Sequence, residues 1–243
     1  MRILALDSSG LVASVAVIED EEMIAEYTIN YKKTHSQTLL PMIDEMAKMI
    51  ELDMATIDAI AVAAGPGSFT GLRIGSATAK GLGLALDKPL VAVPTLEAIA
   101  YNLAGTKALV CPLMDARRNQ VYTGVYYFDG STIKTLKPQC AQDIEEIIAY
   151  LNEENRPVIF LGDGVPVYQT IIEDKMRLEY SFAPAHLNRQ RAGALGTLAK
   201  AYYQVGDLQS ANEYRPDYLR VSQAERERAE KEKMNANSKG DDS

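Results

Sequence analysis

The sequence predicts an α/β protein built from two related lobes. Strand-like and helix-like patterns alternate along the chain, and the order of three strands, a helix, a strand and a helix occurs twice. Each copy opens with a short apolar run that ends in an aspartate, Asp7 in the first and Asp115 in the second. A chain of 243 residues, 47% of them hydrophobic, is long enough to bury a core in each lobe.

The first copy begins with three strands joined by tight turns. Short apolar runs bounded by polar turn residues are typical of strands. A helix with apolar residues at helical spacing follows, and the next helix comes after a glycine-rich loop. We expect strands at 2–6, 12–18, 23–29, 57–64 and 89–93, and helices at 37–51, 72–86 and 95–103.

The second copy repeats this order in pattern rather than in residue identity. Its strands are expected at 108–114, 120–128, 132–136 and 157–161, and its helices at 142–152, 165–173 and 191–204. We therefore expect a first lobe at 1–104 and a second at 105–222. Residues 223–243 are charged and then small and polar, which predicts a disordered tail.

Charge and composition limit the classes of function. The net charge of −8 disfavours direct binding to a phosphate backbone, so a partner should supply most of any RNA contact. Cys111 and Cys140 have no disulfide or metal-binding spacing. No apolar run approaches the roughly 18 residues that a membrane span needs, and the chain starts on a strand pattern. These features predict a cytoplasmic protein.

The glycine-rich loop at 65–71 is the sharpest local signal. Its glycines permit positive φ and close backbone approach, and a hydroxyl residue can cap the helix that follows. Two interpretations stay open: a phosphate or nucleotide loop at a helix N-terminus, or a strand-to-helix turn with structural glycines. It is not a Walker A loop, because no Gly-Lys-Ser/Thr follows. The candidate loop residues are Gly65, Gly67, Ser68, Thr70, Gly71 and Arg73.

Two helices carry patterns that suggest close packing. The helix after the loop has small residues at Gly75, Ala79 and Gly83, with a parallel stripe at Ala77, Gly81 and Ala85. Glycine inside a helix costs roughly 1 kcal/mol relative to alanine, so its backbone should lie close to a neighbour. That neighbour is either its own sheet or a helix of another subunit. The helix at 37–51 is rich in methionine, which suits either a core or an adaptable partner face.

The polar residues favour no complete catalytic site. Asp7 and Asp115 could grip a metal-bound nucleotide between two lobes, but the residues after Asp115 include no glycine pair to wrap a phosphate. Only two histidines occur, His35 and His186, so no metal site is expected. We expect His35 to make a local hydrogen bond and His186 to lie on the surface.

Several segments in this order resemble the bacterial TsaB family, also called YeaZ. They include Asp7-Ser8-Ser9, the motif GPGSFTGLRIG at 65–75, and further stretches at 35–41, 79–82, 94–98, 115–118, 162–164 and 216–220. The resemblance covers about residues 1–222. It implies an actin-like, two-lobed fold of the sugar kinase and heat-shock ATPase superfamily, with duplicated RNase H-like lobes.

The resemblance also implies a role. TsaB-like proteins are non-catalytic scaffold subunits that pair with the catalytic subunit TsaD and are joined by the ATPase TsaE. The complex forms N6-threonylcarbamoyladenosine at position 37 of tRNAs reading codons that begin with adenine. The implied chain is a homodimer when alone, binds no cofactor by itself, and has ATP or ADP at most at a subunit junction. An ATP-dependent kinase of the same fold is the alternative, and two histidines make a metallopeptidase a poor third.

The family's dimer face lies on two helices of the first lobe. For this chain it implies partner contacts at Leu39, Ile43, Met46, Ile50, Gly75, Ala79 and Gly83. The candidates for a minor contact with tRNA are Arg117, Arg118, Arg215 and Arg220.

Overall fold

The computed structural model describes residues 1–31 and 34–219. The strands of the first half are β1 (Arg2–Asp7), β2 (Ala13–Glu19), β3 (Glu22–Ile29), β4 (Ala59–Gly65) and β5 (Leu90–Pro94). Those of the second half are β6 (Leu109–Asp115), β7 (Gln120–Asp129), β8 (Thr132–Asp143), β9 (Val158–Leu161) and β10 (Tyr180–Phe182).

The two halves form two sheets with one topology. The first sheet has the order β3-β2-β1-β4-β5, and the second has the matching order β8-β7-β6-β9-β10. In each sheet the first three strands are antiparallel and the last two lie parallel to the central one. The duplication predicted from the sequence is therefore confirmed by the strand order, and the fold is the expected two-lobed α/β class.

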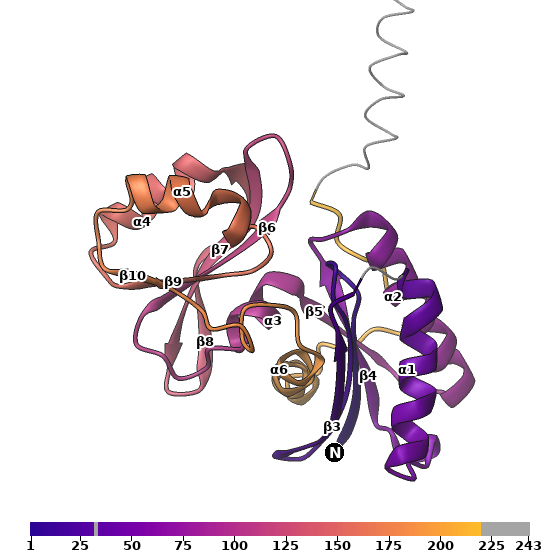
Figure 1. Cartoon of the computed structure of the whole chain (residues 1–243). Coiled ribbons are helices and arrows are strands. Elements are labelled where there is room, and N and C mark those ends of the chain that lie inside the picture. Colours follow the sequence, from indigo (N-terminus) through magenta and orange to yellow (C-terminus); the bar gives the residue numbers. More distant parts are fainter. Residues whose placement is uncertain (32–33, 220–243) are drawn as a thin grey trace, which may run out of the picture.

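Six α-helices connect and cover the strands in the described part of the chain. They are α1 (His35–Met49), α2 (Phe69–Leu86), α3 (Thr95–Tyr101), α4 (Ile144–Glu153), α5 (Val165–Lys175) and α6 (Ala192–Gln204). In Figure 1, α1 and α2 lie on the outer side of the first sheet and α4 and α5 on the outer side of the second, while α3 and α6 lie between the sheets.

The last helix of the second half packs on the first sheet, and the last helix of the first half lies against both sheets. Leu195 and Ala199 of α6 are buried against the first sheet, beside Ala5 and Ala16. Ile99 of α3 is buried in a cluster with residues of the second sheet. The expected boundaries, 1–104 and 105–222, assign α3 to the first lobe and α6 to the second. In the structure α6 covers the first sheet, and α3 also contacts the second. A sequence boundary cannot reveal this packing, because α6 has an apolar face whichever sheet it covers.

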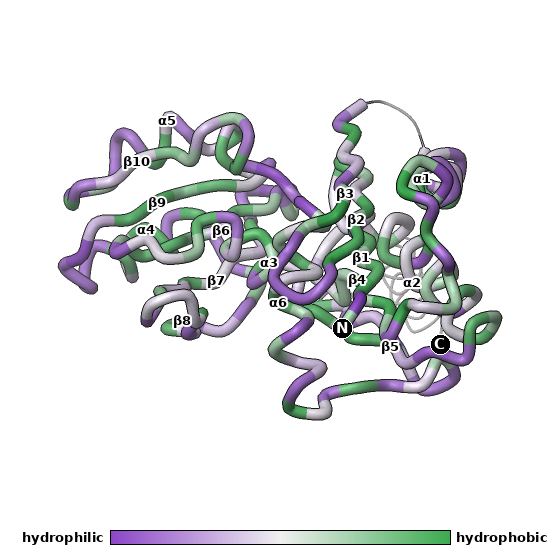
Figure 2. Tube along the Cα trace, turned by 90° about the horizontal axis from the view of Figure 1, so that it is seen from below, coloured by the Kyte–Doolittle hydropathy of each residue, from purple (hydrophilic) through white to green (hydrophobic). Residues whose placement is uncertain are grey.

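Strand alternation explains why the first sheet has two buried faces. Leu4 and Leu6 of β1 face the cluster under α1 and α2, whereas Ile3 and Ala5 face the cluster under α6. Figure 2 shows the hydrophobic colouring concentrated along these inner strands. In the described residues, no helix combines the length and the apolar character needed to cross a membrane.

After α6 the chain returns across the first lobe. We call residues 209–218 the C-terminal strap. Gln209 exchanges two backbone hydrogen bonds with Leu90 at the edge strand β5, Tyr214 is fully buried in the core under α1 and α2, and Asp217 N donates to Ala64 O at 2.6 Å. The strap therefore covers the open edge of the first sheet and ends beside the glycine loop.

Some element boundaries differ from the expected ones. β8 runs on to Asp143 instead of ending near 136, because β7 pairs with it along almost its full length. α2 begins at Phe69, inside the glycine-rich segment, because Ser68 caps it. The short strand β10 and a 3-10 helix, Met54–Thr56, were not predicted. The charged tail after residue 222 lies outside the described residues.

Candidate functional site

The glycine loop packs against backbone on two sides. A Cβ atom at Gly67 or Gly71 would lie less than 3.0 Å from a carbonyl oxygen of the turn after β1, that of Ser9 or Ser8 respectively. A Cβ at Gly65, which has φ of +118°, would meet Asp217 O equally closely. The glycines are thus needed for contacts within the chain, whatever else the loop binds.

The amides of this loop also have partners inside the molecule. Gly65 N donates to Thr95 Oγ1 at 3.1 Å, and Ser68 N donates to Ser9 O at 2.7 Å. Gly71 N donates to the side chain of Ser68, which is the N-cap of α2. These contacts support the interpretation of the loop as a structural strand-to-helix turn. Thr70 and Arg73 are exposed on the first turns of α2.

The first strand-end acid lies in a buried polar cluster. Asp7 is fully buried, and its Oδ1 accepts hydrogen bonds from Ser9 N at 2.8 Å and Ser9 Oγ at 2.6 Å. Among the described residues its Oδ2 has no hydrogen-bond partner. Burial raises the pKa of Asp7, since desolvation outweighs the two hydrogen bonds and the attraction of His35. The side chain therefore favours its protonated form more than an exposed aspartate does.

His35 and Gln190 border the same turn. His35 Nε2 donates to Gly10 O at 2.7 Å, and the side-chain amide of Gln190 lies against Gly10. The expected local hydrogen bond of His35 is thus wrong, because its partner lies 25 residues earlier in the chain. Both carry a buried polar atom, His35 Nδ1 and Gln190 Nε2, without a partner in the described part of the chain. His186 is exposed, as expected.

The second strand-end acid, Asp115, stabilises a surface turn. Asp115 is exposed, and its Oδ1 accepts from Arg117 N at 2.8 Å and from Tyr168 Oη at 3.0 Å. It thereby holds a turn in which Arg117, Arg118 and Asn119 have φ of 64°, 55° and 59°. The two aspartates therefore have unlike surroundings. Residues 1–31 and 34–219 contain no group of three or more potential metal ligands.

The expected partner contacts require a correction. Most of them lie inside their own lobe rather than on its surface. Leu39, Ile43 and Met46 of α1 are at most 3% exposed. Ala79 of α2 is fully buried in the same cluster, and Ile50 packs against it in a half-buried position. Gly75 and Gly83 are also buried: a Cβ at Gly75 would meet Ser8 Oγ, and one at Gly83 would meet Leu90. Helical spacing identified the apolar face, but only packing shows what it faces.

The opposite faces of the same helices are exposed. In α2 these include Ala77, Gly81 and Ala85, the parallel small-residue stripe, and Leu84 at 62% exposure. A Cβ at Gly81 would have no atom within 4 Å, so this glycine is not explained by packing inside the chain. In α1, Leu40 and Met49 are 55% and 70% exposed.

The candidate arginines lie on separate elements. Arg117 and Arg118 are exposed at the turn between β6 and β7, and Arg215 is exposed on the C-terminal strap. Arg220 lies outside the described residues. Sequence reasoning missed Phe69 and Tyr218, whose rings lie 5.0 Å apart beside Arg73. Their positions in the sequence could have indicated them, because Phe69 follows the helix cap Ser68 and Tyr218 lies in the motif at 216–220.

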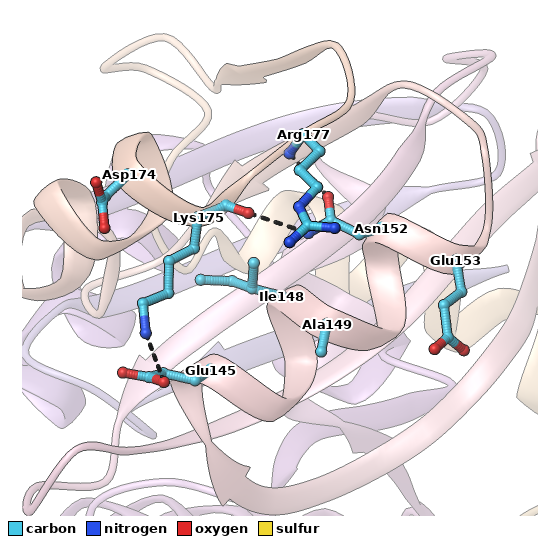
Figure 3. Close-up of a pocket in the computed structure, with 8 residues that line it drawn as sticks. All are labelled: Glu145, Ile148, Ala149, Asn152, Glu153, Asp174, Lys175 and Arg177. Atoms are coloured by element: carbon cyan, nitrogen blue, oxygen red, sulfur yellow. Dashed lines mark hydrogen bonds and ion pairs between the residues drawn. The ribbon is translucent and has the colours of Figure 1, made fainter.

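A surface cavity of about 590 Å³ lies elsewhere, between α4 and α5. Figure 3 shows Lys175 reaching across it to Glu145, at 2.6 Å. The side-chain amide of Asn152 makes two hydrogen bonds with the backbone at the end of α5. It donates to Lys175 O at 3.0 Å and accepts from Arg177 N at 2.9 Å. These polar groups join the two helices, and none of the candidate site residues lines the cavity.

The two sheets of matching strand order, with α3 and α6 between them, define a two-lobed α/β protein with a duplicated architecture. The family model described as TsaD, tRNA N6-adenosine threonylcarbamoyltransferase, matches residues 22–228. The TsaB protein of Bacillus subtilis, a tRNA threonylcarbamoyladenosine biosynthesis protein, is 34% identical over 96% of this chain and all of its own length. The Escherichia coli TsaB is 35% identical over 55% of this chain and 58% of its own.

A solved structure agrees with these relatives. YeaZ from Pseudomonas aeruginosa superposes with a TM-score of 0.76 at 26% identity, covering 89% of this chain and 99% of that one. The chain therefore belongs to the TsaB (YeaZ) family and has the family's role in the biosynthesis of threonylcarbamoyladenosine in tRNA.

Proposed function

We propose that this chain is the non-catalytic scaffold subunit of the complex that attaches the threonylcarbamoyl group to adenosine 37 of tRNAs reading codons that begin with adenine. The observation that carries the proposal is the surroundings of the two strand-end aspartates. Asp7 is buried beside a turn that fills the space against the glycine loop, and Asp115 holds a turn of the second lobe. Both are engaged in structure rather than arranged around a common reacting group.

The proposed partners are the catalytic subunit TsaD and the ATPase TsaE, with a homodimer when the chain is alone. The match of the TsaD family model supports a related, pseudo-symmetric partner. We place the docking face on the exposed sides of α1 and α2, at Leu40, Met49, Ala77, Gly81 and Leu84. Small residues there let a partner helix approach closely, while the exposed apolar side chains provide area to bury.

A pair of variants tests the docking face. Gly81→Arg adds bulk and charge in open space, so the monomer should stay folded and fail to pair. Ala79→Arg, two residues away, places the same side chain in the core and should unfold the protein. Size-exclusion chromatography with the catalytic subunit, together with circular dichroism, separates the two effects. A Gly81→Arg chain that still forms the heterodimer would rule out this face.

The function itself is tested in cells. Depletion of the chain should remove the modified adenosine from tRNA, measured by mass spectrometry of tRNA nucleosides. The wild-type chain should restore it, and Gly81→Arg should not. Unchanged modification after depletion would contradict the proposal, irrespective of which face makes the contact.

The proposal includes no nucleotide bound by the lone chain. Any ATP or ADP would then bind at a junction with another subunit. The proposed compartment is the cytoplasm, where tRNA is modified. Isothermal calorimetry with ATP and magnesium provides the test. Tight binding by the isolated chain would favour the alternative, an ATP-dependent kinase of the same fold.

A further inference from the structure

Three side chains from two distant segments form a stack at the start of α2. The guanidinium of Arg73 lies 4.0 Å from the ring centroid of Phe69, and the Phe69 ring lies 5.0 Å from that of Tyr218 with a tilt of 43°. Arg73 is exposed, Tyr218 is 37% exposed and Phe69 is half-buried. We call these three residues the aromatic ledge. An exposed ring stack of this kind is not required to complete the core beneath it.

The chain holds the ledge in place from both sides. Phe69 follows the N-cap Ser68 directly, so the first turn of α2 fixes its position. Tyr218 follows Asp217, whose backbone N–H is bonded to Ala64 O and whose carboxylate accepts from Gln139 Nε2 at 3.3 Å. The rings are therefore preorganised, and a ligand that stacks on them meets little of the usual cost of ordering side chains.

The charges around the ledge favour an anionic partner. Arg73 is an exposed cation of the ledge itself, and the N-terminal end of an 18-residue helix carries partial positive charge. Arg215, on the strap, is also exposed, and its Nη1 donates to Asn212 O and Tyr214 O. Two acids of the neighbouring strap remain charged, because their hydrogen-bond partners are neutral: Asp217 accepts from Gln139, and Glu213 accepts from Ser210 Oγ at 2.7 Å. In a chain of net charge −8, Arg73 and the end of α2 are therefore the groups of this surface that attract a phosphate.

We propose that the aromatic ledge is a contact surface for an unpaired segment of tRNA. Aromatic rings and guanidinium planes are the groups on which unstacked RNA bases pack, and nearby arginines bind the connecting phosphates. This inference rests on the proposed function, because tRNA is the substrate of that complex. It differs from the docking face at Gly81, which requires apolar burial rather than stacking.

Binding of an unmodified tRNA transcript tests the ledge. Tyr218→Ala should weaken binding about 5- to 150-fold, the range expected for loss of one stacked base, while Tyr218→Phe keeps the ring and should bind within about twofold of wild type. Arg73→Gln should lower the salt dependence of the affinity by about one phosphate contact. Filter binding is measured for the chain alone and for its mixture with the catalytic subunit.

Controls separate this inference from its alternatives. Arg177→Gln removes an exposed arginine of the second lobe and should leave both affinity and salt dependence unchanged. Heterodimer formation by Tyr218→Ala should equal that of wild type. Loss of pairing would show a protein interface, and equal tRNA affinity of Tyr218→Ala and wild type in both settings would show no RNA contact. Either result overturns the inference while leaving the scaffold role to the cellular test.

Discussion

At the scale of single residues, Asp7 stands where the sequence pattern predicted a strand-end acid, and its burial costs free energy when the carboxylate is charged. It ends the first strand of its lobe, as the pattern predicted, but it is enclosed with one carboxylate oxygen unpartnered among the described residues. Desolvation destabilises the charged form of this carboxylate more than the Ser9 hydrogen bonds and the attraction of His35 stabilise it. The position therefore weakens the fold at neutral pH rather than supporting it.

Replacement of Asp7 by Asn should raise the melting temperature at pH 7. The asparagine oxygen can still accept from Ser9, and no charge has to be desolvated. Because the folded-state pKa of Asp7 lies above its ordinary value of 3.8, the folded form binds the proton more tightly. Its contribution to stability is full below the unfolded pKa and is lost as pH rises through the folded pKa.

Urea unfolding across about pH 4 to 8 measures this difference. The wild type should lose stability relative to Asp7→Asn as the pH rises. The exposed Asp174→Asn serves as the matched control and should follow the wild type. An Asp7→Asn chain that is less stable than wild type at pH 7 would show that the carboxylate is ionised and favourably paired.

At the scale of elements, the start of α6 is fixed by a strand far away in the sequence. Glu26 of the edge strand β3 accepts from Gly193 N at 2.8 Å and from Arg191 Nε at 3.0 Å, and it also contacts Arg191 Nη2. Ser14 Oγ accepts from Ala192 N at 2.8 Å. Two side chains of the first sheet thus satisfy amides that the helix itself leaves unpaired.

Glu26→Ala should destabilise the protein by about 1–3 kcal/mol, since it removes a charged acceptor from a helix N-terminus and takes the carboxylate partner away from the partly buried Arg191. Glu22→Ala changes an exposed glutamate of the same strand and should cost less than about 0.5 kcal/mol. Chemical denaturation gives both values. Equal effects of the two variants would indicate that β3 does not anchor α6.

At the scale of the whole molecule, the C-terminal strap closes the first lobe and reaches the second. Tyr214 fills the core under α1 and α2, and Asp217 connects the glycine loop to β8 through Gln139. The last described residues are therefore part of the packing of the first lobe. A truncation within the strap would therefore affect both lobes.

Tyr214→Ala should cost about 3–5 kcal/mol, as expected for an aromatic side chain removed from a core. The hydroxyl of Tyr214 is buried without a partner among the described residues, so Tyr214→Phe should be neutral or stabilising. Tyr218→Ala, at the exposed ledge, should cost less than about 1.5 kcal/mol. Thermal unfolding of the three full-length variants distinguishes the core role from the surface role, and a large loss in Tyr214→Phe would reveal a hidden hydrogen bond.

The sequence by itself determined the elements, their repeated order and the family. Period-two and helical patterns depend on residues near each other in the chain, so β1 to β5 and α1 to α6 could be located within a few residues. The motif at 65–75 carried the family assignment for the same reason, because its glycines are required by local backbone contacts.

Only the tertiary structure decided which face of each helix is inside. Gly75, Ala79 and Gly83 and the stripe of Ala77, Gly81 and Ala85 have equal spacing and similar size, yet the first is buried and the second is exposed. The packing of α6 on the first sheet, the contact of α3 with the second sheet and the contact between Phe69 and Tyr218 could likewise not be seen in the chain order. Burial and tertiary contact depend on residues of other elements, 149 positions apart in the case of Phe69 and Tyr218, and local pattern carries no information about them.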